Sequence, residues 1–89
     1  MAGKPGLISG VVRDPNGKPI IDARVYFTGG PEPLPDIAAL TNSNGEFTLS
    51  APSAGTYSIE SNADGFSPKA ATVAVASGQR LHLDIRLER

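Results

Sequence analysis

Residues 80–88 decide the fold, and they read Arg-Leu-His-Leu-Asp-Ile-Arg-Leu-Glu. Apolar and polar side chains alternate strictly along this stretch, which is the period of a β-strand rather than that of a helix. One face of such a strand is entirely apolar, while the other is charged or polar. The pattern predicts a strand that covers a core with one face and meets water with the other, as is typical of antiparallel sheets.

The same alternation recurs along the chain and predicts further strands. The first is expected over residues 7–13, and a weaker one over residues 35–41, through Ile37 and Leu40. With the other alternating segments, this gives about seven strands at the spacing of a sandwich or barrel. The positions expected to face inward are Ile8, Gly10 and Val12; Ala23, Val25 and Phe27; Phe47 and Leu49; Tyr57 and Ile59; and Val73 and Val75.

Turn residues separate the predicted strands. Residues 14–17, 42–45 and 62–65 each begin with Asp or Asn and end, three positions later, with glycine. The Asx side chain accepts the backbone N–H two residues on, and glycine supplies the positive φ that closes a hairpin. Each segment therefore predicts a tight hairpin turn, and Ser77-Gly78 predicts a fourth. Residues 29–36 carry three prolines, which predict an extended loop.

Composition limits the size and the partners of the protein. Its 89 residues, 39% hydrophobic and 19% charged, predict one globular domain over residues 1–89 with a core of about 7–88. The net charge of −1 provides no basic surplus for nucleic acid or for anionic membranes. No apolar run approaches the roughly 18 residues of a membrane span, so we expect no membrane insertion.

No catalytic residue, cofactor or metal site is expected from the residue types. The absence of cysteine excludes disulfides and thiolate sites. His82, the sole histidine, is predicted on the solvated face of the last strand with Asp84, whereas a catalytic triad needs a buried and oriented pair. The Asx–Gly turns lack the glutamate that follows the glycine of a calcium loop by six residues, and no helices flank them.

An ordered series of short motifs resembles the carboxypeptidase regulatory-like domain family, a transthyretin-like or immunoglobulin-like β-sandwich. The resemblance covers nearly the whole chain. The motifs are Gly-Val-Val-Arg-Asp at 10–14, Gly-Lys-Pro at 17–19, Ala-Arg-Val at 23–25, Thr-Asn-Ser-Asn-Gly-Glu-Phe at 41–47, Gly-Thr-Tyr at 55–57, Gly-Phe at 65–66 and the alternating last strand.

The resemblance implies a non-catalytic module attached to an exported peptidase, an outer-membrane receptor, a polysaccharide-degrading enzyme or a surface protein. We therefore expect an extracytoplasmic location (periplasmic, secreted or cell surface) as part of a longer protein. Related sandwiches of intradiol dioxygenases hold iron with two tyrosines and two histidines. A chain with one histidine cannot build that site.

Three residues are candidates for partner binding. Leu34 and Ile37 lie in the loop of residues 29–40, and Tyr26 is the one aromatic side chain predicted to point outward. The expected function is a structural or protein-interaction module, monomeric in isolation, whose partner is a protein or the rest of a longer chain. Two alternatives remain: a carbohydrate-binding accessory domain with Tyr26 as a contact, and an adaptor that docks a protein cargo. The loop, with Leu40, can instead cap one open end of the core.

Overall fold

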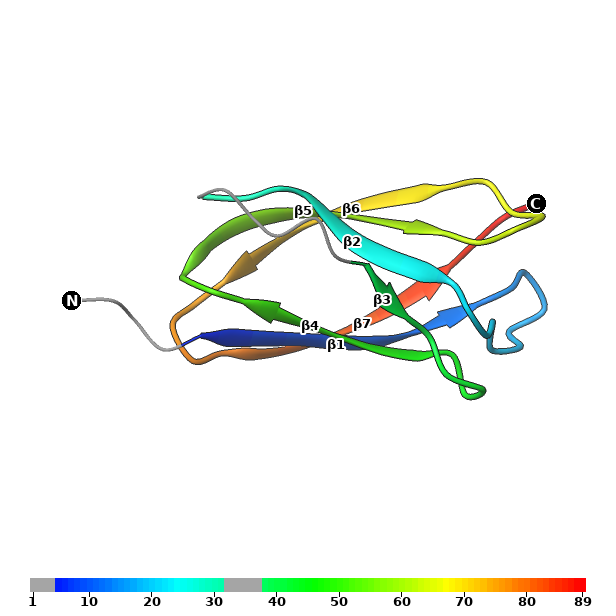
Figure 1. The fold of residues 1–89 in the computed structure, drawn as a ribbon, viewed down its shortest axis with the longest axis horizontal. Coiled ribbons are helices and arrows are strands. Elements are labelled where there is room, and N and C mark those ends of the chain that lie inside the picture. Colours follow the sequence, from blue (N-terminus) through cyan, green and yellow to red (C-terminus); the bar gives the residue numbers. More distant parts are fainter. Residues whose placement is uncertain (1–4, 32–37) are drawn as a thin grey trace.

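The computed structural model describes residues 5–31 and 38–89, which form seven strands in two facing sheets (Figure 1). Within these residues, no helix forms that is long and apolar enough to cross a membrane. One sheet has the order β4-β1-β7 and the other β3-β2-β5-β6, so the predicted all-β sandwich is confirmed. The strands are β1 (Gly6–Arg13), β2 (Arg24–Gly29), β3 (Ala39–Leu40), β4 (Glu46–Ala51), β5 (Gly55–Asn62), β6 (Lys69–Val75) and β7 (Arg80–Arg86).

One strand pair departs from the antiparallel arrangement expected for the last strand. β7 pairs with β1 in parallel, from Leu7 opposite Arg80 to Arg13 opposite Arg86, while the other strand pairs of the described residues are antiparallel. The alternation of β7 arises because the outer face of the three-stranded sheet meets solvent. Alternation therefore reports that one face is exposed, and it carries no information about the direction of the neighbouring strand.

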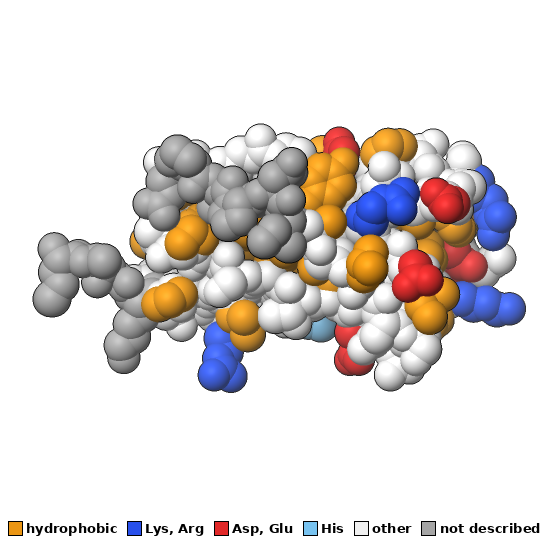
Figure 2. All heavy atoms as spheres, viewed as in Figure 1, with side chains coloured by type: hydrophobic (Ala, Val, Ile, Leu, Met, Phe, Trp, Pro, Cys, Tyr) orange, Lys and Arg blue, Asp and Glu red, His pale blue; other side chains and the backbone are white. Residues whose placement is uncertain are grey.

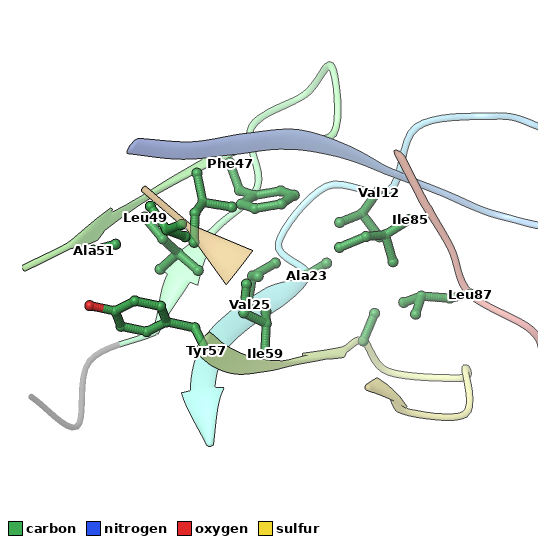
Figure 3. Packing of buried hydrophobic residues seen from close by; sticks show 13 residues of the cluster. Val12, Ala23, Val25, Phe47, Leu49, Ala51, Tyr57, Ile59, Ile85 and Leu87 are labelled. Atoms are coloured by element: carbon green, nitrogen blue, oxygen red, sulfur yellow. The ribbon is translucent and has the colours of Figure 1, made fainter. Parts of the chain in front are cut away.

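The core lies between the sheets and contains the side chains that the alternation places inward (Figure 3). Phe27, Val73, Leu81 and Leu83 are half-buried and pack against its edge. Gly10 is inward because only glycine fits there, since an added Cβ would lie 2.2 Å from the Leu83 carbonyl oxygen. The fully buried members include Ile8, Val12, Ala23, Val25, Ala51, Tyr57 and Leu87.

Two of the predicted Asx turns are confirmed. The Asp14 carboxylate accepts the N–H groups of Asn16 and Lys18, each at 2.9 Å, and Gly17 has a φ of 86°. The Asn42 side chain in the same way accepts the N–H groups of Asn44 and Glu46, each at 3.0 Å. In both turns the side chain holds the backbone closed before any tertiary contact is needed.

The third turn begins one residue later than predicted. Its closing hydrogen bond joins the Phe66 N–H to the Ala63 carbonyl at 3.1 Å, with Gly65 at a φ of 84°. Asn62 remains in β5, where it pairs with Arg24 of β2. Asn62, which was expected to start the turn, is therefore held in β5 by its pairing with β2. Gly65 still closes the turn, as predicted.

Most of the predicted hairpin turns do not join neighbouring strands. Residues 42–45 connect β3 to β4, and Ser77-Gly78 connects β6 to β7, in each case across the two sheets. Residues 14–17 fold the chain back on β1 through a bridge between Arg13 and Pro19 before it crosses to β2. Only the turn at Gly65 joins two paired strands, β5 and β6. Turn chemistry is local, so it does not specify which strands are brought together.

Two buried hydroxyls bind the backbone where the chain passes from one sheet to the other, at opposite ends of the sandwich. Thr41, 2% exposed, donates to the Ile20 carbonyl at 2.6 Å and accepts the Ala23 N–H at 2.8 Å. The Tyr57 hydroxyl donates to the Ser53 carbonyl at 2.6 Å and accepts the N–H of the same residue at 3.1 Å. Both satisfy backbone groups that have left one sheet and have not yet joined the other.

Candidate functional site

On the outer face of the four-stranded sheet, the larger side chains gather around Tyr26. Arg24 stands opposite Leu40 of β3 on one side and Asn62 of β5 on the other, and Tyr26 stands opposite Glu60. These five residues project outward because the alternate positions of β2 and β5 fill the core. We term this surface the Tyr26 face.

The Tyr26 side chain lies on the outer face, as the sequence predicts, and it is held there. Its hydroxyl donates a hydrogen bond to the Glu60 carboxylate. This bond, together with partial burial and the negative charge of Glu60, raises the pKa of Tyr26 above its ordinary value. The phenol is therefore a fixed, neutral and half-buried group.

Arg24, the basic member of the Tyr26 face, is only weakly engaged. An Arg24 guanidinium nitrogen lies 3.5 Å from a carboxylate oxygen of Asp64, whose side chain is fully exposed. Exposed pairs of this kind contribute little to stability because water and salt screen them. Arg24 can therefore exchange Asp64 for an acidic or carbonyl group of a partner at little cost.

Leu40 places an exposed apolar side chain beside these polar groups. It is 62% exposed, and with Ile21 it is one of two large apolar side chains that stand out from the described surface. The expectation that Leu40 caps the core is wrong: β3 alternates, so Ala39 faces inward and Leu40 faces solvent. Leu34 and Ile37, the other predicted contacts of this loop, lie outside the described residues.

A shallow groove of about 510 Å³ lies on the other side of β3. It runs from β3 across β4 to the outer face of the three-stranded sheet, and Leu40 contributes to its wall. Apolar, acidic and basic side chains are interspersed over this side of the molecule (Figure 2). The lining residues are Ser9, Gly10, Ala39, Leu40, Asn42, Glu46, Phe47, Thr48 and His82.

The described side chains do not assemble a reactive centre. His82 and Asp84 are both exposed, as predicted, and Asp84 pairs with Arg13 at 3.3 Å rather than with the imidazole. No group of three His, Cys, Asp or Glu residues gathers among the residues that the structure describes. The five aromatic side chains are buried or half-buried, so none presents a fully exposed ring to a sugar.

Sequence reasoning missed most of the Tyr26 face. It identified Tyr26 from the period of β2, but it did not bring Glu60, Asn62 and Leu40 to the same surface. Those neighbours depend on the register of three strands, and register is set by core packing rather than by any local motif. The exposure of Leu40 follows from the pairing of β3 with β2, and a strand of two residues is too short to show an alternation in the sequence.

The comparisons with known proteins identify a family. The family model of the carboxypeptidase regulatory-like domain matches residues 7–88. This match confirms the resemblance that the ordered motifs indicate. A comparison with curated proteins found no match.

Solved structures share the fold at low identity. Chlorocatechol 1,2-dioxygenase from Pseudomonas putida aligns with a TM-score of 0.72 and 15% identity, over 98% of this chain and 61% of its own. The minor pilin GBS52 from Streptococcus agalactiae aligns with a TM-score of 0.72 and 15% identity, over 100% of this chain and 46% of its own. A chain of a type II cohesin–X-dockerin complex from Acetivibrio cellulolyticus aligns with a TM-score of 0.70 and 20% identity, over 92% of this chain and 56% of its own. This chain thus spans less than two thirds of each, and the likeness shows the fold alone.

Proposed function

Because the chain belongs to the carboxypeptidase regulatory-like domain family, we propose that it is a non-catalytic protein-interaction module of a longer, exported protein. We further propose that its partner contacts the Tyr26 face. The observation that carries this proposal is the 62% exposed Leu40 beside Tyr26 and Arg24 on a paired sheet. Tyrosine and arginine are enriched in protein interfaces, and an exposed leucine supplies apolar area to bury.

The sheet lowers the cost of recognition at this surface. Tyr26 is fixed by Glu60, and the backbone of β2 pairs with β5 and, at Arg24 and Val25, also with β3. A partner therefore orders few groups when it binds, which leaves more of the contact energy for affinity. Leu34 and Ile37 remain predicted contributors, because they precede Leu40 in the same loop.

Structural neighbours support the module and its exported setting. They include a pilin and a complex of cohesin and dockerin modules, which by their names assemble with other proteins. The dioxygenases among them share the sandwich at low identity, 15% for the enzyme from Pseudomonas putida, so the likeness carries over the fold and not the activity. The family itself is regulatory rather than catalytic.

Site-specific photo-crosslinking in the native host tests the proposal. A photoreactive residue in place of Leu40 is expected to capture one protein, or another part of the same longer chain. The matched control is Ser50, which is exposed on the opposite sheet and should capture nothing specific. Leu40→Ser should abolish binding of the captured partner without lowering the melting temperature.

Three results would contradict the proposal. Capture from position 50 and not from position 40 would move the interface to the three-stranded sheet. A glycan-array signal that Tyr26→Ala abolishes, without a protein partner, would favour the carbohydrate alternative. A fall in melting temperature with Leu40→Ser would show that this side chain supports the fold rather than a partner contact.

A further inference from the structure

The four sheet edges of the sandwich differ in how they are protected. Exposed edge strands pair with other chains unless they are short, charged, bulged or interrupted by proline. β3 is two residues long, and β7 carries a charged or polar side chain at every second position. β4 is followed by Pro52, and its first carbonyl, that of Glu46, accepts the Asn42 N–H at 3.1 Å.

The protections of β6 are confined to its start: Pro68 precedes it and Lys69 is its first residue, whereas its other six residues carry neither a charge nor a proline. It is seven residues long and pairs with β5 in unbroken register, without a bulge or a proline. Lys69 is its one charged residue, and it stands at the very start of the strand. Among the described strands, β5 is its only pairing partner, so its other side is an open edge.

The side chains of β6 leave this edge accessible. Ala70, Thr72 and Ala74 are exposed on the outer face, while Ala71 and Val73 are half-buried toward the core. Alternate residues of an antiparallel edge strand direct their N–H and C=O groups away from the sheet. Methyl and hydroxymethyl groups are too small to screen those backbone groups from an incoming strand.

We propose that β6 pairs antiparallel with β6 of a second copy of this chain, about a two-fold axis at Thr72. This register pairs all seven residues, and it places Thr72 opposite Thr72 of the copy. Ala70 then faces Ala74, and Ala71 faces Val73. The two four-stranded sheets become one continuous sheet of eight strands.

Charge selects β6 over β7 for this role. In the β6 pair, Lys69 faces Val75, and the two lysines lie at opposite ends, about 20 Å apart along the strands. The same symmetric pairing of β7 about Leu83 would place Arg80 opposite Arg86 twice, and like charges directly opposite each other are destabilising. A threonine pair at the axis is favourable instead.

The β6 pair goes beyond the proposed function and does not depend on it. The Tyr26 face lies on β3, β2 and β5, so pairing through β6 leaves it uncovered. Two copies would present two such faces on one sheet. The β6 pair replaces the monomer that the sequence predicts, and it follows the commonest symmetry of soluble homo-oligomers.

Charge-swap variants at the axis test the proposal with the full chain. Thr72 is exposed, so Thr72→Lys and Thr72→Glu should have the melting temperature of the wild type at concentrations where the wild type is monomeric. Sedimentation equilibrium of the wild type should show a concentration-dependent dimer. Each variant alone should lose the dimer, because like charges meet at the axis, and an equimolar mixture of the two should regain it.

The control variant is Thr48→Lys, which places the same charge at an exposed threonine of β4 and should dimerise like the wild type. Amide exchange provides a second readout, since residues 70–74 should exchange more slowly as concentration rises. A wild type that stays monomeric at millimolar concentration would overturn the proposal. So would a dimer that survives Thr72→Lys, or a mixture of the two variants that stays monomeric.

Discussion

Tyr57 and Tyr26 lie on neighbouring strands of the same sheet, yet they face opposite sides of it and their hydroxyls bind different kinds of group. Tyr57 is fully buried, and its hydroxyl binds the backbone of Ser53 at a chain crossing. Tyr26 is half-buried on the outer face, and its hydroxyl binds the Glu60 side chain. In this pair, the buried hydroxyl completes backbone hydrogen bonds of the fold. The hydroxyl on the outer face instead fixes a side chain, which the fold can spare for recognition.

The largest expected effect is at Thr41, the interior hydroxyl with two backbone partners. Thr41→Val keeps the shape but removes the side-chain partner of the buried Ala23 N–H and of the partly buried Ile20 carbonyl. We expect a loss of roughly 2–4 kcal/mol in the free energy of unfolding, measured by urea denaturation. Thr48→Val, at an exposed threonine, should change it little. An equal loss in both variants would remove the contrast between interior and outer face.

Tyr57→Phe should have the next largest effect. It retains the ring, which packs against Phe27 with centroids 5.1 Å apart, and removes only the hydroxyl. Since one N–H and one carbonyl of Ser53 then lose their partner, we expect a loss of about 1–2 kcal/mol in the same measurement. Tyr26→Phe is the matched change on the outer face and should leave the unfolding midpoint within error. A larger loss for Tyr26→Phe would show that the outer face also holds the fold.

Ser61 is an exception that sharpens the contrast, because its interior hydroxyl completes no hydrogen bond among the described residues. Its side chain is 1% exposed, and its oxygen has no hydrogen-bond partner among the described residues. Ser61→Ala removes a buried polar group that gains nothing, so stability should stay equal or rise by up to about 1 kcal/mol. A loss comparable to that of Tyr57→Phe would mean that the hydroxyl has a role that the contacts do not account for.

The smallest effect concerns the titration of Tyr26. Its pKa is raised in the folded state, so the folded chain keeps a proton that the unfolded chain releases near pH 10. The associated stability is therefore present below pH 10 and is lost as pH rises through the folded pKa. The absorbance difference between wild type and Tyr26→Phe should titrate above the ordinary value, and Glu60→Gln should bring it back down. An unchanged midpoint in Glu60→Gln would exclude the carboxylate as the cause.

Local patterns predicted the elements of this fold, and longer-range facts had to come from the structure. Alternation identified the strands and their inward residues, including Gly10, whose close approach to Leu83 allows no side chain. Asx chemistry located the turns at Asp14 and Asn42. Each of these signals acts over a few residues, which is why a single sequence displays it.

The direction of β7 and the neighbours of Tyr26 were beyond such reasoning. The parallel pair of β1 and β7 joins residues about 70 positions apart, and it leaves the alternation of either strand unchanged. Glu60 reaches Tyr26 only through the register of β2 against β5, which includes an irregularity between Phe27 and Gly29. The candidate site therefore depends on the register between strands, whereas the core follows from the two-residue alternation within each strand.

The parallel pairing of β1 and β7 also governs how the domain carries mechanical load. β1 starts and β7 ends at opposite ends of the long axis of the molecule (Figure 1). A pulling force applied to Gly6 and Arg86 therefore runs along the two strands, and it loads the hydrogen bonds between them in shear, all together. In a terminal antiparallel hairpin, by contrast, the bonds open one after another. We expect single-molecule stretching between these ends to show one high-force rupture, a property suited to a module placed in series within a longer chain.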